Sequence, residues 1–328
     1  MLAARAPANN GGSMSDTIGI RHLRYFLAVA QTENFTRAAE RLHISQPCVS
    51  QQITQLERAL RAPLFRRVGK RVFLTEAGAT FRKGAEVVIR KLEDACNAVH
   101  DIAGLISGRV DVGVIPALHV GWMPSVLEDI SRDYPGVTIG VHELASSEVE
   151  SELEAGRLDI GFGLMTHNSP NLRYERLVSE PFSLIVSKES EFAKRKTVEL
   201  KTLEGMRLAL LPESFDMRRA ADEILRHAKV HPKVVFEIDN IDAVLSSVVL
   251  AKMPTLLPAI VLRGRELSSL RAIPLAGKTR KMEFGLMWPA TSAPSPGALA
   301  VATSLKAAVK TAVKTAVKTA ASSTGKTA

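Results

Sequence analysis

Cysteine is scarce in this sequence. Only Cys48 and Cys96 occur among 328 residues, and they lie far apart without a metal-ligand spacing. This scarcity argues against a disulfide framework and against a zinc site, so no metal is expected. We interpret both cysteines as small packing residues. A thiol-based redox switch is the alternative, although neither cysteine lies in the part of the chain that we expect to bind a ligand.

Long hydrophobic runs are also missing. Hydrophobic residues make up 46% of the chain, but no apolar run reaches membrane length and the N-terminus has no apolar segment suited to secretion. The sequence therefore predicts a soluble, cytoplasmic protein of two or three domains with no membrane partner. Residues 1–20 are expected to be a disordered extension, in which Met14 is an alternative translation start.

The motifs of common catalytic sites are absent as well. There is no glycine-rich phosphate loop followed by Lys and Ser or Thr, no HExxH pair and no GxSxG turn. Nothing supplies a nucleophile together with its base. We therefore predict that the protein is not an enzyme and uses no cofactor.

Residues 35–60 carry the most informative pattern, two short helices around a tight turn. The second helix is expected from Gln46 to Leu60, with Ser45 placed to cap it and Pro47 in its first turn. One side of this helix is an apolar stripe with spacings of 4, 3 and 4: Val49, Ile53, Leu56 and Leu60. Another side carries small polar groups and amides without a carboxylate: Gln46, Pro47, Ser50, Gln51 and Thr54. That side is suited to lie against a polyanion, although an ordinary amphipathic surface helix has the same stripe.

The flanking segments favour a nucleic-acid role. A preceding helix completes a three-helix core, and RRVGKRVFLT predicts a hairpin around Gly69 with four basic side chains: Arg66, Arg67, Lys70 and Arg71. Residues 21–75 contain ten Lys and Arg against three Glu, a net charge of +7. Such a charge is typical of a unit that neutralises phosphates. We interpret residues 21–78 as a winged helix-turn-helix whose second helix lies in the major groove of double-stranded DNA.

A longer ordered pattern runs through this region. It consists of Phe35, Ala38, Ala39, Leu42, Ser45, Gln46, Pro47, Ser50, Ile53, Leu56, Glu57, Pro63, Leu64, Phe65, Arg67, Leu74, Thr75, Ala77 and Gly78. The pattern resembles the DNA-binding region of LysR-type transcriptional regulators, and a weaker resemblance continues to about residue 290. Arg61 stands where the family usually has a helix-ending glycine, which predicts either a non-glycine left-handed cap or a different cap. Lys70 stands where Arg is common.

The predicted DNA-binding residues follow from the polar face, the wing and the resemblance. They are Thr36, Arg37, Ser45, Gln46, Pro47, Ser50, Gln51, Thr54, Gln55, Arg67 and Lys70. Amide side chains can read adenine edges, whereas Arg37, Arg67 and Lys70 are expected to position phosphates.

A long helix is predicted from Thr75 to about Leu105. Its apolar residues alternate spacings of 4 and 3 over three heptads: Phe81, Ala85, Val88, Leu92, Ala95, Val99 and Ile102. We interpret residues 79–107 as a dimerising linker helix, because a symmetric dimer can read two related half-sites. Burial of the seam against the winged domain is the alternative. The resemblance implies the same helix, implies that dimers pair into tetramers through the C-terminal domains, and allows RNA polymerase as a partner.

From Gly108 the pattern changes to alternating strands and helices. It predicts a βαβαβ lobe, crossing strands near 178–187 and 271–288, and a second α/β lobe between them. This arrangement resembles the type 2 periplasmic binding-protein fold, which the LysR family uses to bind effectors. The fold class is therefore α+β, with a two-lobed α/β effector domain at 108–292. Residues 76–305 carry a net charge of about −3, so this region is not itself a nucleic-acid surface.

Ligands of such folds bind between the lobes, at the carboxyl ends of strands. Helix N-termini there favour a small anion. The candidate effector-binding residues are Pro116, Ala117, Leu118, His119, Leu164, Thr166, Phe215, Arg218, Asn240 and Thr255. By resemblance to cyanate-operon regulators, Phe215 and Arg218 match second-lobe positions, whereas Ala117 and His119 replace small hydroxyl residues. His119 and Arg218 are alternatively surface or packing residues.

Residues 293–328 are predicted to be an Ala/Lys-rich C-terminal tail. Lysine recurs every four residues at 306, 310, 314 and 318, without an apolar stripe wide enough for a core. The tail is either a solvated segment or a non-specific phosphate contact. The sequence as a whole predicts a DNA-binding transcriptional regulator whose anionic co-inducer binds between the lobes. A solute-binding receptor with non-specific nucleic-acid adhesion is the alternative.

Overall fold

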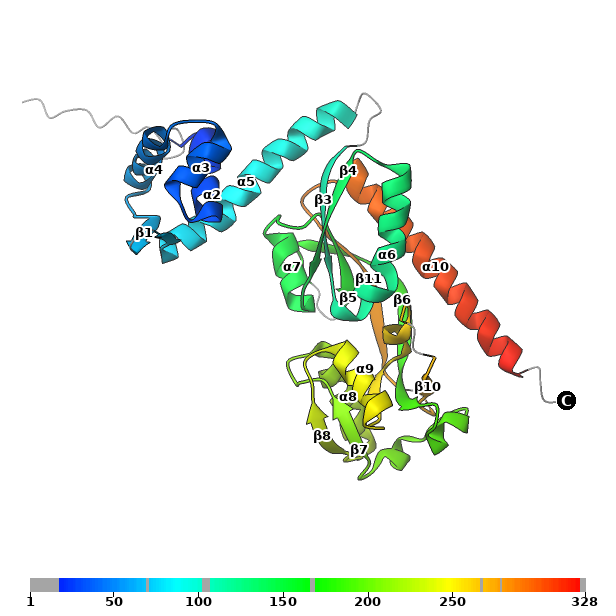
Figure 1. The fold of residues 1–328 in the computed structure, drawn as a ribbon. Helices are drawn as coiled ribbons and strands as arrows, with labels where there is room; N and C mark the ends of the chain where they lie inside the picture. The colour runs from blue at the N-terminus through cyan, green and yellow to red at the C-terminus, as the bar shows by residue number, and fades with distance from the viewer. Residues whose placement is uncertain are drawn as a thin grey trace, which may run out of the picture. The chain divides into compact units, whose positions relative to one another are not determined.

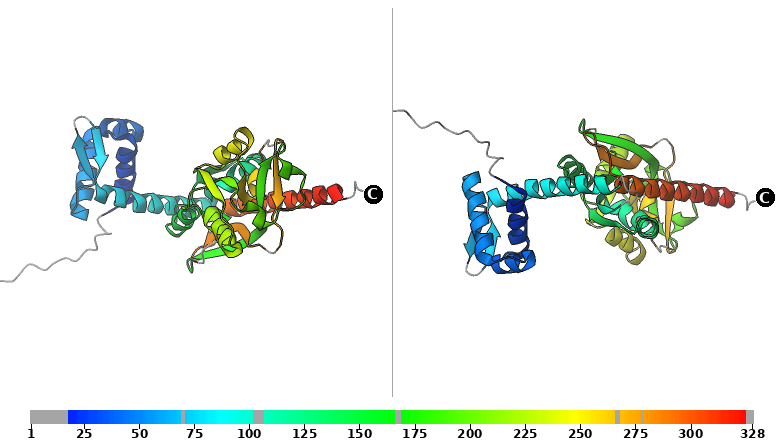
Figure 2. Two further views of the ribbon diagram at one scale, coloured as in Figure 1. Left: turned by 90° about the horizontal axis from the view of Figure 1, so that it is seen from below. Right: turned by 90° about the horizontal axis from the view of Figure 1, so that it is seen from above.

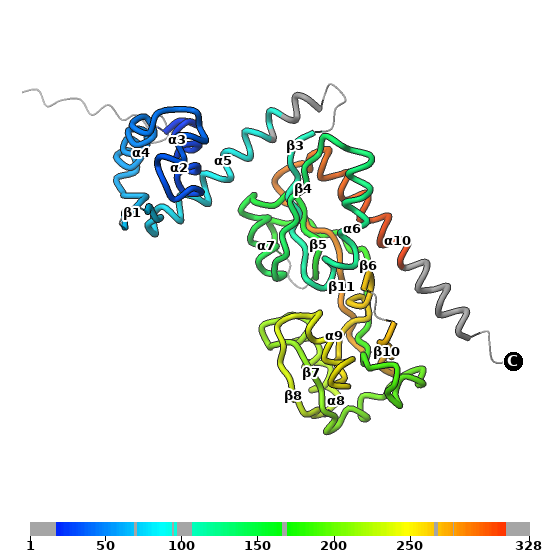
Figure 3. Tube along the Cα trace, in the orientation of Figure 1, coloured from blue at the N-terminus to red at the C-terminus, as the bar shows by residue number. Residues whose placement is uncertain are grey.

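The chain divides into two compact units, Met1–Cys96 and Asn97–Ala328. The computed structural model describes residues 18–68, 71–101, 107–165, 169–265, 268–277 and 279–324, and Figure 3 draws the uncertain positions in grey. The architecture is mixed α/β, with a helical N-terminal unit and a larger unit built on a curled sheet (Figure 1). In the described part of the chain, no helix is both long and apolar enough to cross a membrane.

The N-terminal unit packs three helices and a wing around one core. The helices are α2 (Ile20–Thr32), α3 (Phe35–Leu42) and α4 (Gln46–Leu60), and the wing is β1 (Phe65–Val68) paired antiparallel with β2 (Arg71–Leu74). Three of the four residues in the apolar stripe predicted for α4, Val49, Ile53 and Leu56, are at most 3% exposed, and the fourth, Leu60, is half-buried against the same core. Phe26 lies at the centre of the core, where its ring contacts those of Phe65 and Phe81 at centroid distances of 5.2 and 5.0 Å.

Helix α4 begins after Ser45 and ends before Arg61, and both capping positions were predicted from the sequence. Ser45 occupies the N-cap position in extended conformation as predicted, although its side chain accepts no capping hydrogen bond. Pro47 lies in the first turn as expected. At the other end Arg61 adopts φ 52° in the left-handed region, which is the first of the two predicted alternatives.

Helix α5 (Glu76–Asp101) begins inside the N-terminal unit and ends outside it. The first turn of α5 packs closely on the backbone at Leu64, because a Cβ on Gly78 would lie 2.1 Å from the Leu64 carbonyl oxygen. The apolar residues of the predicted heptad seam differ in burial. Ala85 is buried in the winged core, whereas Val88 and Leu92 are 47% and 37% exposed. The side chain of Val99 and all of Ile102 lie outside what the structure describes.

The first lobe of the C-terminal unit, lobe I, is a parallel sheet covered by helices. Its strands are β3 (Gly108–Val114), β4 (Val137–Glu143) and β5 (Ile160–Leu164), connected through α6 (Pro116–Asp133) and α7 (Ser146–Glu154). The returning strand β11 (Lys281–Pro289) joins this sheet antiparallel to β5. The carboxyl ends of β3, β4 and β5 therefore meet at one edge, where α6 and α7 begin.

Lobe II is smaller and is inserted between the crossing strands. It contains the short helices η1 (Glu191–Lys194) and η2 (Leu200–Leu203), the parallel pair β7 (Arg207–Leu210) and β8 (Lys233–Glu237), α8 (Asp216–Ala228) and α9 (Ile241–Leu250). Strands β9 (Thr255–Pro258) and β10 (Leu270–Pro274) flank β6 (Leu172–Ser187) on this side, and η3 (Ala259–Leu262) follows β9.

Strand β6 is the structural link between the lobes. Its first part pairs with β11 in lobe I, and its last residues pair with β9 and β10 in lobe II (Figure 1). The crossing segment predicted near 178–187 is part of this strand. A continuous strand therefore runs through both lobes.

The C-terminal segment contradicts the predicted tail beginning at 293. Residues Pro296–Thr324 form one helix, α10, which packs along α6 and β3 (Figure 2). Its inward side chains are at most 7% exposed: Ala298, Ala300, Val301, Ala302, Leu305 and Val309. Small alanines allow α10 to approach α6 closely, so the first half of the helix belongs to the lobe I core. The part beyond Ala312 has described backbone only.

Candidate functional site

The polar side of α4 forms a shallow groove of about 510 Å³ on the N-terminal unit. Its lining contains amides, hydroxyls and one guanidinium, and no carboxylate: Gln46, Pro47, Ser50, Gln51, Thr54, Gln55 and Arg58. The Thr54 hydroxyl donates to the Ser50 carbonyl oxygen at 2.9 Å, which holds this side chain close to the helix. The longer amides are therefore the groups able to reach outward from the face.

Helix α3 and the wing present further predicted contacts. Thr36 and Arg37 are exposed in the first turn of α3, where Asn34 Oδ1 accepts from their backbone N–H groups at 2.8 and 3.1 Å. The Arg67 guanidinium lies 5.4 Å from the centroid of the Phe35 ring, so the wing contacts the start of α3. Lys70 lies outside the described residues.

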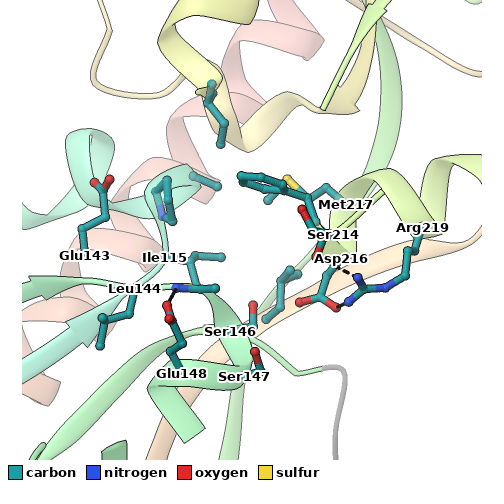
Figure 4. Close-up of a pocket in the computed structure, with 16 residues that line it drawn as sticks. Ile115, Glu143, Leu144, Ser146, Ser147, Glu148, Ser214, Asp216, Met217 and Arg219 are labelled. Atoms are coloured by element: carbon teal, nitrogen blue, oxygen red, sulfur yellow. Dashed lines mark hydrogen bonds and ion pairs between the residues drawn. The ribbon is translucent and has the colours of Figure 1, made fainter. Parts of the chain in front are cut away.

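A cavity of about 270 Å³ lies between the two lobes of the C-terminal unit (Figure 4). Lobe I contributes the ends of β3, β4 and β5 with the starts of α6 and α7, and lobe II contributes the starts of α8 and α9. The lining residues are Ile115, Pro116, Ala117, Glu143, Leu144, Ala145, Ser146, Ser147, Glu148, Leu164, Ser214, Phe215, Asp216, Met217, Arg219 and Ile241. Four helices thus begin at this cavity, and their N-termini give it a positive backbone potential.

The start of α7 offers hydrogen-bond donors to the cavity. Ser146 is only 5% exposed, lines the cavity, and its hydroxyl has no hydrogen-bond partner among the described residues. Glu148 Oε2 accepts from the Ala145 backbone N–H at 3.0 Å and so satisfies one of the helix-start donors itself. The first-turn N–H groups of α7 and the Ser146 hydroxyl are thus available to an acceptor in the cavity.

The charged side chains of the cavity are already paired. Arg219 Nη1 donates to the Ser214 carbonyl oxygen at 2.7 Å, and its Nη2 pairs with Asp216. Glu143 Oε2 lies 2.6 Å from His119 Nδ1. Figure 4 shows the Asp216–Arg219 pair on the lobe II wall of the cavity, and Ser146 and Ser147 on the lobe I wall. The lining therefore holds three carboxylates and one guanidinium, and that guanidinium is engaged.

Comparison with known protein families covers nearly the whole described chain. A family model described as "Bacterial regulatory helix-turn-helix protein, lysR family" matches residues 20–79. A second, described as "LysR substrate binding domain", matches residues 103–310. The chain belongs to the LysR family of transcriptional regulators.

Individual relatives agree with this membership. The HTH-type transcriptional regulator YwbI of Bacillus subtilis is 31% identical over 271 residues, which cover 82% of this chain and 89% of that protein. The Hca operon transcriptional activator HcaR of Escherichia coli is 35% identical over 189 residues, covering 57% of this chain and 63% of its own length. The solved structure of full-length CbnR complexed with its target DNA has a TM-score of 0.69 at 22% identity, covering 89% of this chain and 100% of that one.

The family assigns the two units their general roles. This LysR-type regulator has an N-terminal DNA-binding helix-turn-helix unit and a C-terminal effector-binding unit. LysR-type proteins are transcriptional regulators and not enzymes. The likeness to solved full-length regulators supports the same arrangement of folds.

The predicted effector-binding residues are only partly brought together in this regulator. Those that line the cavity are Pro116, Ala117, Leu164 and Phe215. Leu118 in the lobe I core and Thr255 in β9 are fully buried and do not line the cavity. Asn240 caps α9 by accepting from the Ala243 N–H at 2.9 Å, beside the lining residue Ile241. Thr166 lies outside the described residues.

Two predicted ligand contacts have structural roles instead. Arg218 is 8% exposed and does not line the cavity; it donates to the Leu211 carbonyl oxygen at 2.6 Å and pairs with Asp222 at 2.8 Å. Arg219, one residue later, is the arginine of the cavity. His119 does not line the cavity and instead contacts the lining residue Glu143.

The sequence predictions missed the loop from Glu143 to Glu148. It follows β4, and the rule that ligands bind at strand carboxyl ends applies to it as to the loops after β3 and β5. The Ala-Ser-Ser-Glu run is also a recognisable helix start. On the DNA-binding unit, Arg58 was missed although it continues the 46, 50, 54 spacing of the polar face.

Proposed function

We propose that this LysR-type regulator recognises an operator through the polar groove of α4 and responds to a small molecule held between the lobes. The observation that carries the proposal is the pairing of a carboxylate-free recognition groove with a cavity at which four helices begin. Each feature suits a distinct ligand class, and the two family models match the two units that carry them.

The groove is suited to read base edges. Gln46, Gln51 and Gln55 supply amides that can bond adenine in a bidentate manner, and Ser50 leaves room for close approach to the major groove. Arg58, Arg37 and Arg67 are positioned to contact phosphates around them, which would set register without reading sequence.

The cavity favours a molecule with one acceptor end and an apolar body. Its acceptor end, a carboxylate in the proposal, would bind the Ser146 hydroxyl and the first-turn N–H groups of α7. Ile115, Leu164 and Phe215 supply apolar contact for the remainder. Multiply charged anions fit poorly, because the lining holds three carboxylates and no unpaired cation.

The proposal also includes self-association of the regulator through α5. Val88 and Leu92 are exposed large apolar residues on the seam and require a partner helix to be buried. A dimer would present two recognition helices to dyad-related half-sites, and pairing of dimers would make a tetramer. An effector that binds one arrangement more tightly would then shift the population of assemblies and alter the bound DNA.

The first test is a gel shift and footprint on the DNA immediately upstream of the protein's own gene, at fixed salt. A protected region with dyad symmetry is expected, and its extent should change with one compound from a panel of small monocarboxylates. Dicarboxylates and inorganic phosphate serve as the comparison. A footprint that never changes, or that changes only with phosphate, would contradict the effector part. Absence of any specific protection would contradict the operator part.

A further inference from the structure

The segment between β9 and β10 contacts both walls of the cavity. Residues 259–265 comprise η3 and the turn after it, and we call them the hinge strap. From the strap, Arg263 extends to lobe I, where Nη2 donates to Glu180 Oε1 on the crossing strand β6 at 2.7 Å. The same guanidinium lies 5.2 Å from the ring centroid of Trp122 on α6. Arg263 therefore joins the strap to the crossing strand and to a helix that begins at the cavity.

The strap is also tied to lobe II, two residues further along. The Arg265 guanidinium pairs with Asp242 in the first turn of α9, and its Nη1 donates to the Val261 carbonyl oxygen at 2.7 Å. The hydrogen bond from Arg265 lowers the pKa of the Asp242 carboxyl, which favours its ionised form. Ile241, the neighbour of Asp242, lines the cavity. Both walls are thus connected to the strap by an arginine.

The contact between α6 and the strap leaves no free space. A Cβ on Gly121 would lie 2.5 Å from the Arg263 carbonyl oxygen. Gly264 has φ +69°, and a Cβ there would lie 2.5 Å from Gly121 Cα. Because Pro116 and Ala117 line the cavity in the first turn of the same helix, a displacement of α6 by a bound molecule must move the strap.

The Arg263 cluster is only partly satisfied in the observed arrangement. The Glu180 and Arg263 side chains are 14% and 20% exposed, and burial raises the pKa of the Glu180 carboxyl. Trp122 Nε1 and Arg263 Nη1 are buried and have no acceptor among the described residues. Incompletely satisfied buried groups disfavour the arrangement that contains them, whereas the ion pair favours it. The two effects oppose each other at the point where the lobes are joined.

We propose that Arg263 is the positioning residue that holds the lobes in the observed arrangement, and that a molecule in the cavity releases this hold by displacing α6 and α9. The inference rests on the proposed use of the cavity but not on the identity of the effector. The strap would then have two arrangements, and the Glu180–Arg263 pair would set their relative populations.

The test measures the distance between the lobes in the full-length chain without a ligand. Cys48 and Cys96 are replaced by serine, and spin labels are attached at Ser151→Cys in lobe I and Thr197→Cys in lobe II, both exposed positions. Labelled chain is diluted with unlabelled chain so that pulsed electron resonance reports distances within one chain. Arg263→Met is expected to shift or broaden the distance distribution, and Arg263→Lys, which keeps the charge opposite Glu180, is expected to restore it in part.

A matched control is available on the same crossing strand, β6. Arg176 on β6 pairs with Glu283 on β11 at 2.8 Å, and both side chains are largely exposed. Arg176→Met removes an ion pair of the same geometry without touching the strap, and the distance distribution should remain that of the parent. If Arg263→Met does not fold, Glu180→Gln weakens the same pair with little change in volume and is measured instead.

Each outcome is decisive for the inference. A folded Arg263→Met or Glu180→Gln chain with the parent distribution, or an equal shift from Arg176→Met, would overturn it. A second measurement separates it from the proposed function, because the ligand-free Arg263→Met chain should protect an operator region of altered extent. Failure of the parent chain to protect any operator would contradict the proposed function, while the interlobe distances would still decide the role of Arg263.

Discussion

Adjacent arginines in α8 have opposite environments, and this difference decides which of them can serve the cavity. Arg218 is 8% exposed and bonded to Leu211, Asp222 and Glu237, whereas Arg219 has a 54% exposed side chain and lines the cavity. Successive helical residues point about 100° apart. The rotation of α8 about its axis therefore decides which of the two arginines is buried and which one lines the cavity.

The two arginines are expected to respond differently to substitution. Arg218→Ala leaves the Leu211 carbonyl and two carboxylates without their donor, and should lower the free energy of unfolding by about 1–3 kcal/mol. Arg219→Ala should change it by no more than about 0.5 kcal/mol. Urea titration followed by circular dichroism measures both values. Equal losses, or a larger loss for Arg219→Ala, would contradict the assignment.

Ser50 is the sharpest test of the α4 groove. Ser50→Glu places a carboxylate among groups that carry none, so specific operator binding should be lost, by at least about tenfold, through repulsion of the phosphates. The helix should remain folded because the stripe of Val49, Ile53 and Leu56 is unchanged. Gel shift and circular dichroism are the measurements. Gln52→Glu, on the same helix but outside the groove, is the control, and similar losses for both variants would argue against recognition by this face.

At the scale of elements, α10 is the clearest difference between sequence expectation and structure. The lysine repeat dominates the sequence pattern, yet the preceding turns supply Val301, Leu305 and Val309 at spacings of four, all at most 3% exposed. Ser304 further ties the helix to α6, because its hydroxyl donates to Asp129 Oδ2 at 2.8 Å. An alanine-rich helix needs only a narrow stripe when its partner helix lies close.

The two parts of α10 should therefore contribute unequally to stability. Leu305→Ala is expected to lower the free energy of unfolding by about 2–5 kcal/mol, because it removes a fully buried side chain. Deletion of residues after Ala312 should change it by about 0.5 kcal/mol or less. Thermal and urea unfolding of the full chain compare the two variants. A large loss on deletion would show that the distal part of the helix also packs.

The exposed part of the α5 seam predicts a specific effect on assembly. Val88→Asp together with Leu92→Asp should convert dimers to monomers, because two carboxylates would be buried in an apolar helix pair. Analytical ultracentrifugation at several protein concentrations measures the change. The variant should keep its fold, since Ala85 and the winged core are untouched. Unchanged association would place the dimer contact elsewhere.

At the scale of the whole molecule, charge is separated between the units. Residues 21–75 carry a net charge of +7, whereas residues 76–305 carry about −3. A further five lysines follow residue 305, so positive charge is concentrated in the unit with the recognition helix and at the C-terminal end of the chain. Association with DNA should consequently depend steeply on salt through residues 21–75, and residues 76–305 should not add to that dependence.

This separation is testable from salt dependence. Arg67→Gln should reduce the slope of log affinity against log salt by about 1 on both operator and unrelated DNA, as expected for one lost phosphate contact per chain. Arg176→Gln, an exposed arginine of lobe I, should leave the slope unchanged. Fluorescence anisotropy at several salt concentrations measures both. A change on operator DNA alone would instead assign Arg67 to base recognition.

Periodicity in the sequence determined the N-terminal unit and the order of elements. The predicted Gln46–Leu60 helix coincides with α4, because a stripe at spacings of 4, 3 and 4 has only one way to be buried and Pro47 marks its start. The two lobes and the crossing segment could likewise be predicted, since runs of alternating strands and helices allow few topologies.

Only the tertiary structure decided which side chains meet. Ser146, Asp216 and Arg219 come from segments up to 73 residues apart, and their convergence depends on how α7 and α8 are oriented by their lobes. The burial of α10 and the contact of Arg263 with Trp122 depend on close approach at alanine and glycine positions, which carry no chemical signal of a partner. Local periodicity therefore defined the elements of this protein, whereas packing between elements distant in sequence defined its cavity and its hinge.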